Sequence, residues 1–176
     1  MKKNINSYLA FYLFVLFLFG LFFLFIKHEI GNDSTISEWI INYSGGFTKR
    51  GIIGQICIFF ANLFSTDLRN IIFGFQTIIL CVYFLLIYFF LKNIKVDRIL
   101  LLSIFTPIFI LYPIAEIEVL ARKEVFIFII LLTYLFIPIH KIGFQNIYKI
   151  IMLPLSVLIW EPVVFFFIIL DKFRYN

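Results

Sequence analysis

The sequence is poor in charge. Charged residues make up 14% of its 176 residues and hydrophobic residues 63%. Soluble globular proteins contain about 25% charged and about 45–50% apolar residues. The composition therefore excludes a soluble globular protein and predicts a membrane protein.

Cysteine and histidine are scarce, and no block of basic residues is present. Cys57 and Cys81 lie in apolar surroundings without a CxxC motif or a neighbouring histidine. We expect two small buried thiols, and neither a disulfide nor a metal site. The formal charge of +5 is spread over short polar segments, which suits contact with anionic lipid headgroups and disfavours nucleic-acid binding. No cofactor is predicted.

Long apolar runs fill most of the chain instead. They are long enough for helices that cross a hydrocarbon core of about 30 Å. They predict an all-α, polytopic helical membrane protein in which residues 1–176 form a single transmembrane bundle. The five predicted transmembrane helices are Tyr8–Ile26, Ile71–Leu91, Ile99–Ala115, Val125–Ile139 and Ile150–Leu170.

The first polar loop is expected to carry an interfacial amphipathic helix over Thr35–Tyr43. Thr35 and Glu38 fit a capping box, in which a hydroxyl and a carboxylate each satisfy a free N–H at a helix start. Apolar side chains then recur at helical spacing, and aromatic members of such a face favour the membrane interface. Gly45 and Gly46 are predicted to end the helix. The apolar face consists of Ile36, Trp39, Ile40 and Tyr43.

The next apolar run, Ile52–Phe64, is short. Its 13 residues would form a helix of about 20 Å, and Gln55 and Asn62 give it a polar stripe. We predict an interfacial or re-entrant helix that does not cross, followed by an N-cap within Ser65–Asp67. The positive-inside rule is tied, because seven basic residues fall on the cytoplasmic side whether or not this segment crosses. The short length of Ile52–Phe64 decides instead: it favours a segment that does not cross, and with it a cytoplasmic N-terminus.

Glycine is concentrated in Asn42–Gln55 (NYSGGFTKRGIIGQ), which holds four of the eight glycines. Lys49 and Arg50 lie in this segment, directly before the short apolar run. A helix start presents free N–H groups and the positive end of the helix dipole. The two basic side chains could complete a phosphate or pyrophosphate site there, and glycines would let the ligand approach the backbone. The alternative is that both side chains extend to lipid headgroups.

Two further groups of charge adjoin apolar runs. Arg122 and Lys123 would make a second phosphate contact, although Glu118 and Arg122, four residues apart, could simply pair on a helix. Glu161 interrupts the last apolar run. A carboxylate inside a membrane is costly and suggests a functional acid or base. Alternatively, the run is two half-segments with Glu161 at a water-exposed break.

Together these residues predict one water-accessible cavity on the outer side, lined by Arg50, Arg122 and Glu161. Asp33 is the other candidate base. It shares the first outer loop with Glu29 and Glu38, and carboxylates in a polar loop can equally be solvated.

The segment GGFTKRGIIGQ, after a first span and a short outer loop, resembles a pattern of roughly GGF-[VT]-[KR]-RG-[LI]-x-G. That pattern is found in polytopic inner-membrane proteins of bacterial surface-polysaccharide clusters. The chain is similar, more loosely, to GT-C glycosyltransferases and O-antigen-polymerase-like proteins. The resemblance implies a polyprenyl-phosphate-linked sugar as substrate, an acidic residue in the first outer loop and basic residues that hold the phosphate. Such proteins usually have eight or more spans, so this chain would correspond to the N-terminal part of a longer protein.

Three functions remain open. The first is surface-glycan assembly at the outer face of the cytoplasmic membrane, with Asp33 or Glu161 as the base. Its substrate-binding residues would be Lys49, Arg50, Arg122 and Lys123. The second is a transport component for a lipid-linked or anionic solute, because intramembrane charge and proline-broken helices also occur in transporters. The third is a non-catalytic membrane assembly subunit that binds a membrane-protein partner.

Overall fold

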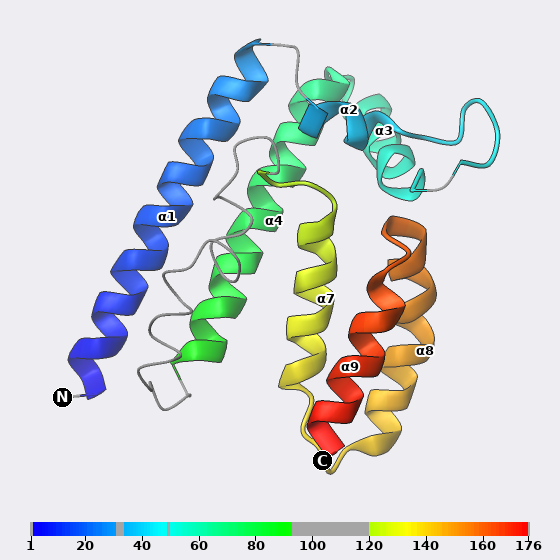
Figure 1. Cartoon of the computed structure of the whole chain (residues 1–176). Coiled ribbons are helices and arrows are strands. Elements are labelled where there is room, and N and C mark those ends of the chain that lie inside the picture. The colour runs from blue at the N-terminus through cyan, green and yellow to red at the C-terminus, as the bar shows by residue number, and fades with distance from the viewer. Residues whose placement is uncertain (1, 31–33, 49, 93–119, 176) are drawn as a thin grey trace.

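The computed structural model describes residues 2–30, 34–48, 50–92 and 120–175, and these form helices joined by turns and loops, without a strand among them (Figure 1). Three helical stretches are long and apolar enough to cross a membrane: Asn6–Ile30, Leu68–Leu91 and Ile142–Ile159. The predicted all-helical class is confirmed. The predicted span Ile99–Ala115 lies outside the described residues.

The longer helices pack side by side. α1 (Lys2–Ile30) and α4 (Leu68–Leu91) pack antiparallel, and α7 (Glu124–Phe136) packs on the other side of α4. α8 (Ile142–Ile159) and α9 (Val163–Tyr175) form an antiparallel hairpin against α7. We call one end of the bundle the basal end; it holds the N-terminus, the 137–141 turn and residue 175. The opposite end is the distal end.

The short helices α2 (Ser34–Ile40) and α3 (Ile52–Phe64) lie at the distal end, at the top of Figure 1. α3 has the predicted bounds, and its C-terminal turn leads to Asp67, which caps α4 as predicted by accepting from the Arg69 N–H at 3.4 Å. The Arg69 guanidinium donates to the Lys27 carbonyl at the end of α1, at 3.1 Å. Both ends of α3 therefore lie at the distal end, and α3 does not run through the bundle.

The predicted last span is wrong. Ile150–Leu170 is not one helix, because α8 ends at Ile159 and α9 starts at Val163 in the opposite direction. Trp160 is extended (φ −160°, ψ 111°). A proline lacks the N–H that a helix needs and disfavours helical geometry in the preceding residue, so Pro162 explains the break. α8 also begins at Ile142, eight residues before the predicted start of that span at Ile150.

α2 also differs from the prediction. It begins at Ser34, so Thr35 lies within the helix instead of capping it, and it ends at Ile40, before the glycines. The Asn42 side chain explains the early end: its Nδ2 donates to the Ile40 carbonyl at 2.9 Å. Local bonds of this kind compete with helix continuation.

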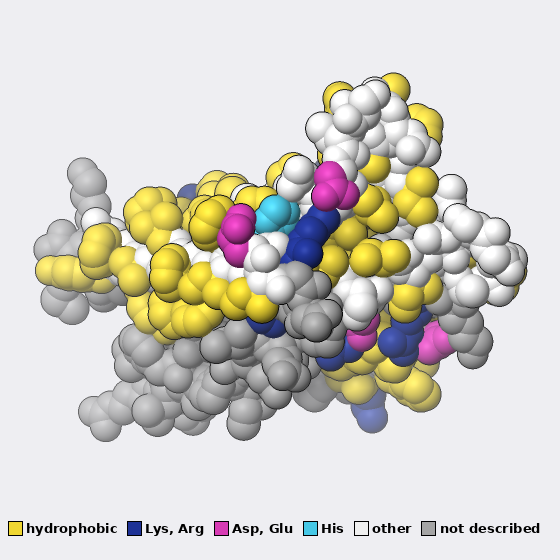
Figure 2. Space-filling model, turned by 90° about the horizontal axis from the view of Figure 1, so that it is seen from above, with side chains coloured by type: hydrophobic (Ala, Val, Ile, Leu, Met, Phe, Trp, Pro, Cys, Tyr) yellow, Lys and Arg dark blue, Asp and Glu magenta, His cyan; other side chains and the backbone are white. Residues whose placement is uncertain are grey.

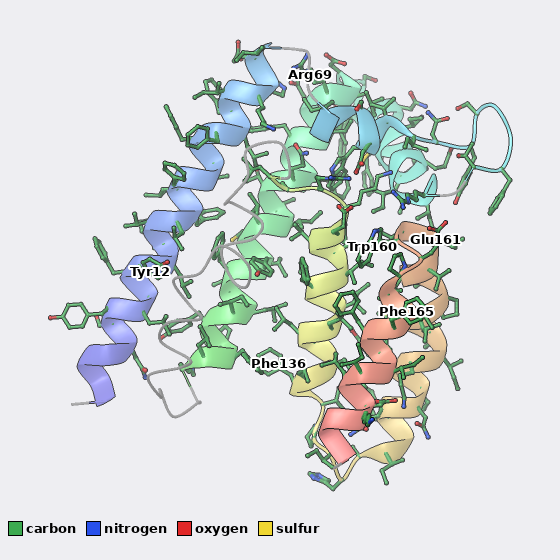
Figure 3. All side chains as sticks on the ribbon, viewed as in Figure 1. Tyr12, Arg69, Phe136, Trp160, Glu161 and Phe165 are labelled. Atoms are coloured by element: carbon green, nitrogen blue, oxygen red, sulfur yellow. The ribbon has the colours of Figure 1, made fainter. Side chains whose placement is uncertain are left out.

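α4 lies at the centre of the packed core. Its Ile72 and Leu80 are fully buried, and Phe90 meets Phe136 of α7 edge-on, with ring centroids 6.3 Å apart (Figure 3). Outward-facing side chains are apolar as well, such as Phe11 on α1 and Phe165 on α9. An apolar surface over the helix sides is typical of a bundle surrounded by lipid.

Candidate functional site

Charged side chains from four separate segments meet at the distal end. Arg50 Nη2 lies 3.7 Å from Glu161 Oε2, and Lys123 Nζ donates to the Arg50 carbonyl oxygen at 2.8 Å. Next to Lys123, Arg122 pairs with Glu38 of α2. Figure 2, which looks onto this end, shows basic and acidic side chains beside each other among hydrophobic ones. Arg50 and Glu161 are thus in contact, as predicted, while a shared cavity lined by Arg50, Arg122 and Glu161 stays a prediction.

Glu161 lies in the turn between α8 and α9, at their upper ends in Figure 3. Its side chain is 42% exposed, and that of Arg50 is 38% exposed. The prediction of a carboxylate inside one continuous span is therefore wrong, because the chain reverses at this residue. The alternative, a break that exposes the carboxylate, describes the structure.

Arg50 has a left-handed backbone, with φ 65°. A non-glycine residue in this region costs of order 1–3 kcal/mol and persists only where its surroundings hold it. Lys123 supplies one such restraint through its bond to the Arg50 carbonyl. α3 begins two residues later, after its N-cap Gly51. The Arg50 backbone is thus held close to the positive end of a helix dipole.

Lys123 is only 3% exposed. Burial lowers the pKa of its ammonium below the usual 10.5 and Arg50 adds to this, whereas Glu38, Cys57 and Glu124 act in the opposite direction. The Nζ faces the Arg50 carbonyl, not the surface. Lys123 therefore positions Arg50 in this structure, although the sequence suggested a direct phosphate contact.

Arg122 makes a two-pronged ion pair with Glu38. Its Nη2 lies 2.5 Å from Oε1 and its Nε 3.2 Å from Oε2, the geometry that makes arginine–carboxylate pairs strong. Glu124 Oε1 lies 3.4 Å from the same Nη2, and Glu124 Oε2 is buried without a hydrogen-bond partner. Glu38 thus binds an arginine 84 residues away in the sequence. The predicted alternative partner, Glu118, lies outside the described residues.

Trp39 secures α2 to the segment before α7. Its side chain is fully buried, and its Nε1 donates to the Ala121 carbonyl at 3.1 Å. Gln76 of α4 reaches the same oxygen at 3.5 Å. Ala121 is left-handed, with φ 52°. The expected place for Trp39, on an interfacial surface, is therefore wrong, because its ring lies inside the bundle.

Two of the clustered glycines permit close contact within the protein. A Cβ on Gly54 would lie 2.1 Å from the Ile41 carbonyl oxygen, and a Cβ on Gly51 would lie 2.6 Å from the Tyr43 ring. These glycines let α2 and its following loop pack against α3. The sequence had suggested that they admit a ligand, but in the structure the protein's own backbone and side chains occupy that space.

Two predicted site residues, Asp33 and Lys49, lie outside the described residues. Trp39, Ala121 and Gln76 support the site in ways that were not predicted from the sequence. Gln76 carried a usable signal, because it is a polar residue inside a long apolar run. Ala121 carried none, since alanine gives no indication of a left-handed backbone.

A second polar cluster joins α7, α8 and α9 toward the basal end. Lys149 Nζ lies 2.9 Å from Asp171 Oδ2, and the Tyr134 hydroxyl donates to the other oxygen of Asp171. This cluster is separate from the distal site and ties the hairpin to α7. Among the described residues, no three His, Cys, Asp or Glu side chains are grouped so that they could hold a metal ion.

No protein family, no curated protein and no solved structure matches this chain.

Proposed function

We propose that this chain is a multi-pass protein of the cytoplasmic membrane that binds the phosphate of a lipid-linked sugar at its distal end, as part of surface-glycan assembly. The observation that carries the proposal is the pair Arg50–Glu161 beside the start of α3, with Lys123 holding the Arg50 backbone. A half-exposed guanidinium at a helix start suits a phosphate group. Arg50 also belongs to the segment that resembles polysaccharide-assembly proteins.

Glu161 occupies the place of an anionic ligand. An ion pair at 3.7 Å with both side chains more than a third exposed contributes about 0–1 kcal/mol. A phosphate offers Arg50 several oxygens and stronger charge-assisted bonds. The ligand can therefore displace the carboxylate at small cost, and Glu161 stays within reach of it.

The displaced carboxylate would then act as a general base. Glu161 would take the proton of an acceptor sugar hydroxyl, whose oxygen forms the new glycosidic bond. The bond between the donor sugar and the lipid phosphate breaks, and Arg50 stabilises the departing phosphate. Asp33 in the first outer loop remains the other candidate base.

We place the distal end on the outer side of the membrane. The hairpin of α8 and α9 returns the C-terminal basic residues to the end that holds the N-terminal ones, and the positive-inside rule favours that end as cytoplasmic. The basal basic residues are Lys2, Lys3, Lys92, Lys141, Lys172 and Arg174.

α3 would lie in the outer interface of this membrane. It exposes Ile56, Phe59 and Leu63 next to the exposed polar side chains of Gln55 and Asn62. A helix with adjoining apolar and polar exposed strips is typical of the boundary between acyl chains and headgroups. There its start would present Arg50 at the level of lipid phosphates.

Binding of polyprenyl phosphate to the purified protein in nanodiscs tests the proposal. We expect Arg50→Ala to weaken binding about tenfold or more, because a charge-assisted bond is lost. Glu161→Gln should strengthen binding up to about fivefold, since a competing ion pair of at most about 1 kcal/mol disappears, and should abolish sugar transfer. Lys92→Ala, at the basal end, is the matched control. If Arg50→Ala binds as well as Lys92→Ala, Arg50 is not part of a phosphate site.

A further inference from the structure

The loop between α2 and α3 presents an aromatic side chain at its tip. Phe47 is 80% exposed, and the Tyr43 ring stacks against it with centroids 5.7 Å apart and planes 7° apart. In Figure 1 the loop leaves the distal end sideways, level with the upper part of α4, instead of extending along the helix axes. The aromatic pair therefore lies beside the bundle at the height where its long apolar helices end.

The loop is ordered by its own contacts. Thr48 Oγ1 donates to the Asn42 carbonyl at 2.9 Å, and the Gly46 N–H donates to the Tyr43 carbonyl at 3.0 Å. Gly46 has φ 113°, which glycine adopts without strain. The base of the loop is also fixed, because the Tyr43 ring packs closely over Gly51. The exposed phenylalanine is thus held in place by a folded loop.

We infer that residues 42–48 insert into the boundary between headgroups and acyl chains on the distal side of the membrane. The loop carries no charge between Asn42 and Thr48, so no charged side chain in it opposes insertion. Tyrosine and other aromatic residues favour this boundary. Ile40 and Ile41, just before the loop, are exposed as well.

Charge complementarity identifies lipid as the occupant. Arg50 lies just beyond the loop with a half-exposed guanidinium, which an anionic headgroup would neutralise. The neighbouring spans indicate the depth of the loop in the membrane. Arg69 at the start of α4 bonds to Lys27 at the end of α1, and these two charged residues mark the level where the apolar surface of the spans ends. The inference requires only that α1 and α4 cross a membrane, and it is independent of any lipid-linked sugar.

Fluorophore labelling of the full chain in vesicles of phosphatidylethanolamine and phosphatidylglycerol tests the insertion. Cys57 and Cys81 are first replaced by alanine, and an environment-sensitive dye is attached at Phe47→Cys. Ser37→Cys, at an exposed polar position of α2, is the matched control. We expect a lipid-borne doxyl group to quench the dye at position 47 and aqueous iodide to quench it several-fold less than at position 37.

Equal iodide quenching at positions 47 and 37 would overturn the inference. Protection at 47 from both quenchers would also overturn it, because a protein surface would then cover the loop. Gly45→Cys provides a second label site at which an added Cβ meets nothing within 4 Å, and circular dichroism verifies the fold of each variant. Polyprenyl phosphate binding by Arg50, repeated in detergent instead of nanodiscs, needs no insertion, so the two proposals can fail separately.

Discussion

Replacing Gly54 by alanine should separate α2 from α3. The new Cβ would lie 2.1 Å from the Ile41 carbonyl oxygen and 2.7 Å from that of Trp39. Carbon and oxygen normally approach no closer than about 3.3 Å, so the end of α2 would have to move by about 1 Å. It cannot move freely, because the Trp39 indole is buried and bonded to Ala121.

The cost follows from these contacts. Overpacking costs about 1–3 kcal/mol, and loss of the Trp39 hydrogen bond adds about 1 kcal/mol. We expect Gly54→Ala to lose about 2–4 kcal/mol, which corresponds to a melting temperature lower by roughly 4–16 °C. Gly74→Ala is the matched control, since that glycine lies in α4 with nothing within 4 Å of an added Cβ. It should gain about 0.4–1 kcal/mol.

Thermal unfolding in detergent, followed by circular dichroism, measures both changes. Trp39 emission in a Trp160→Phe background adds a local probe, because a ring that leaves the core shifts its emission to the red. Gly54→Ala should show the red shift and Gly74→Ala should not. Equal melting temperatures for the two variants, with unshifted emission, would refute the close packing of α2 on α3.

Three further predictions concern charged groups. The pKa of Lys123 is lowered in the folded state, so the unfolded chain binds more protons at pH values between that lowered pKa and about 10.5. The free energy of unfolding should therefore rise with pH across this range. Denaturant unfolding of Lys123→Met, measured at several pH values in the range, should lack the rise. A double-mutant cycle with Glu38→Gln and Arg122→Gln should give a coupling free energy of about 0.5–3 kcal/mol, and additive losses would contradict the pair. Asp171→Asn and Lys149→Met should each lower the melting temperature but bind polyprenyl phosphate like wild type, because their cluster lies away from the distal site; lost binding would contradict that separation.

Local signals in the sequence predicted the elements well where one segment decides the outcome. The bounds of α3 and the Asp67 cap follow from apolar run length and from capping chemistry, which act within a few residues. The break at Trp160–Pro162 was visible as an alternative. Its consequence was missed, because run length alone does not distinguish one span from two helices that double back.

The site depends on contacts that no local pattern encodes. The proximity of Arg50 and Glu161 was predicted from shared sidedness, but Glu38 was assigned to the start of its own helix and Trp39 to an interfacial surface. A capping box is worth about as much as one hydrogen bond, so a bidentate ion pair with Arg122 overrides it. Burial of Trp39 likewise outweighs its preference for an interface.

The distances along the chain between site partners impose an order of assembly. Lys123 bonds to a residue 73 positions earlier, Arg122 to one 84 earlier, and Trp39 to one 82 later. During synthesis α1 and α4 can pair first, whereas Trp39 and Glu38 must wait until residues 121–123 emerge. Closing such long loops is slow relative to local folding. The distal site is thus completed only after α7 arrives, and a ribosome paused before residue 120 would hold a paired α1–α4 unit with an open, unassembled site.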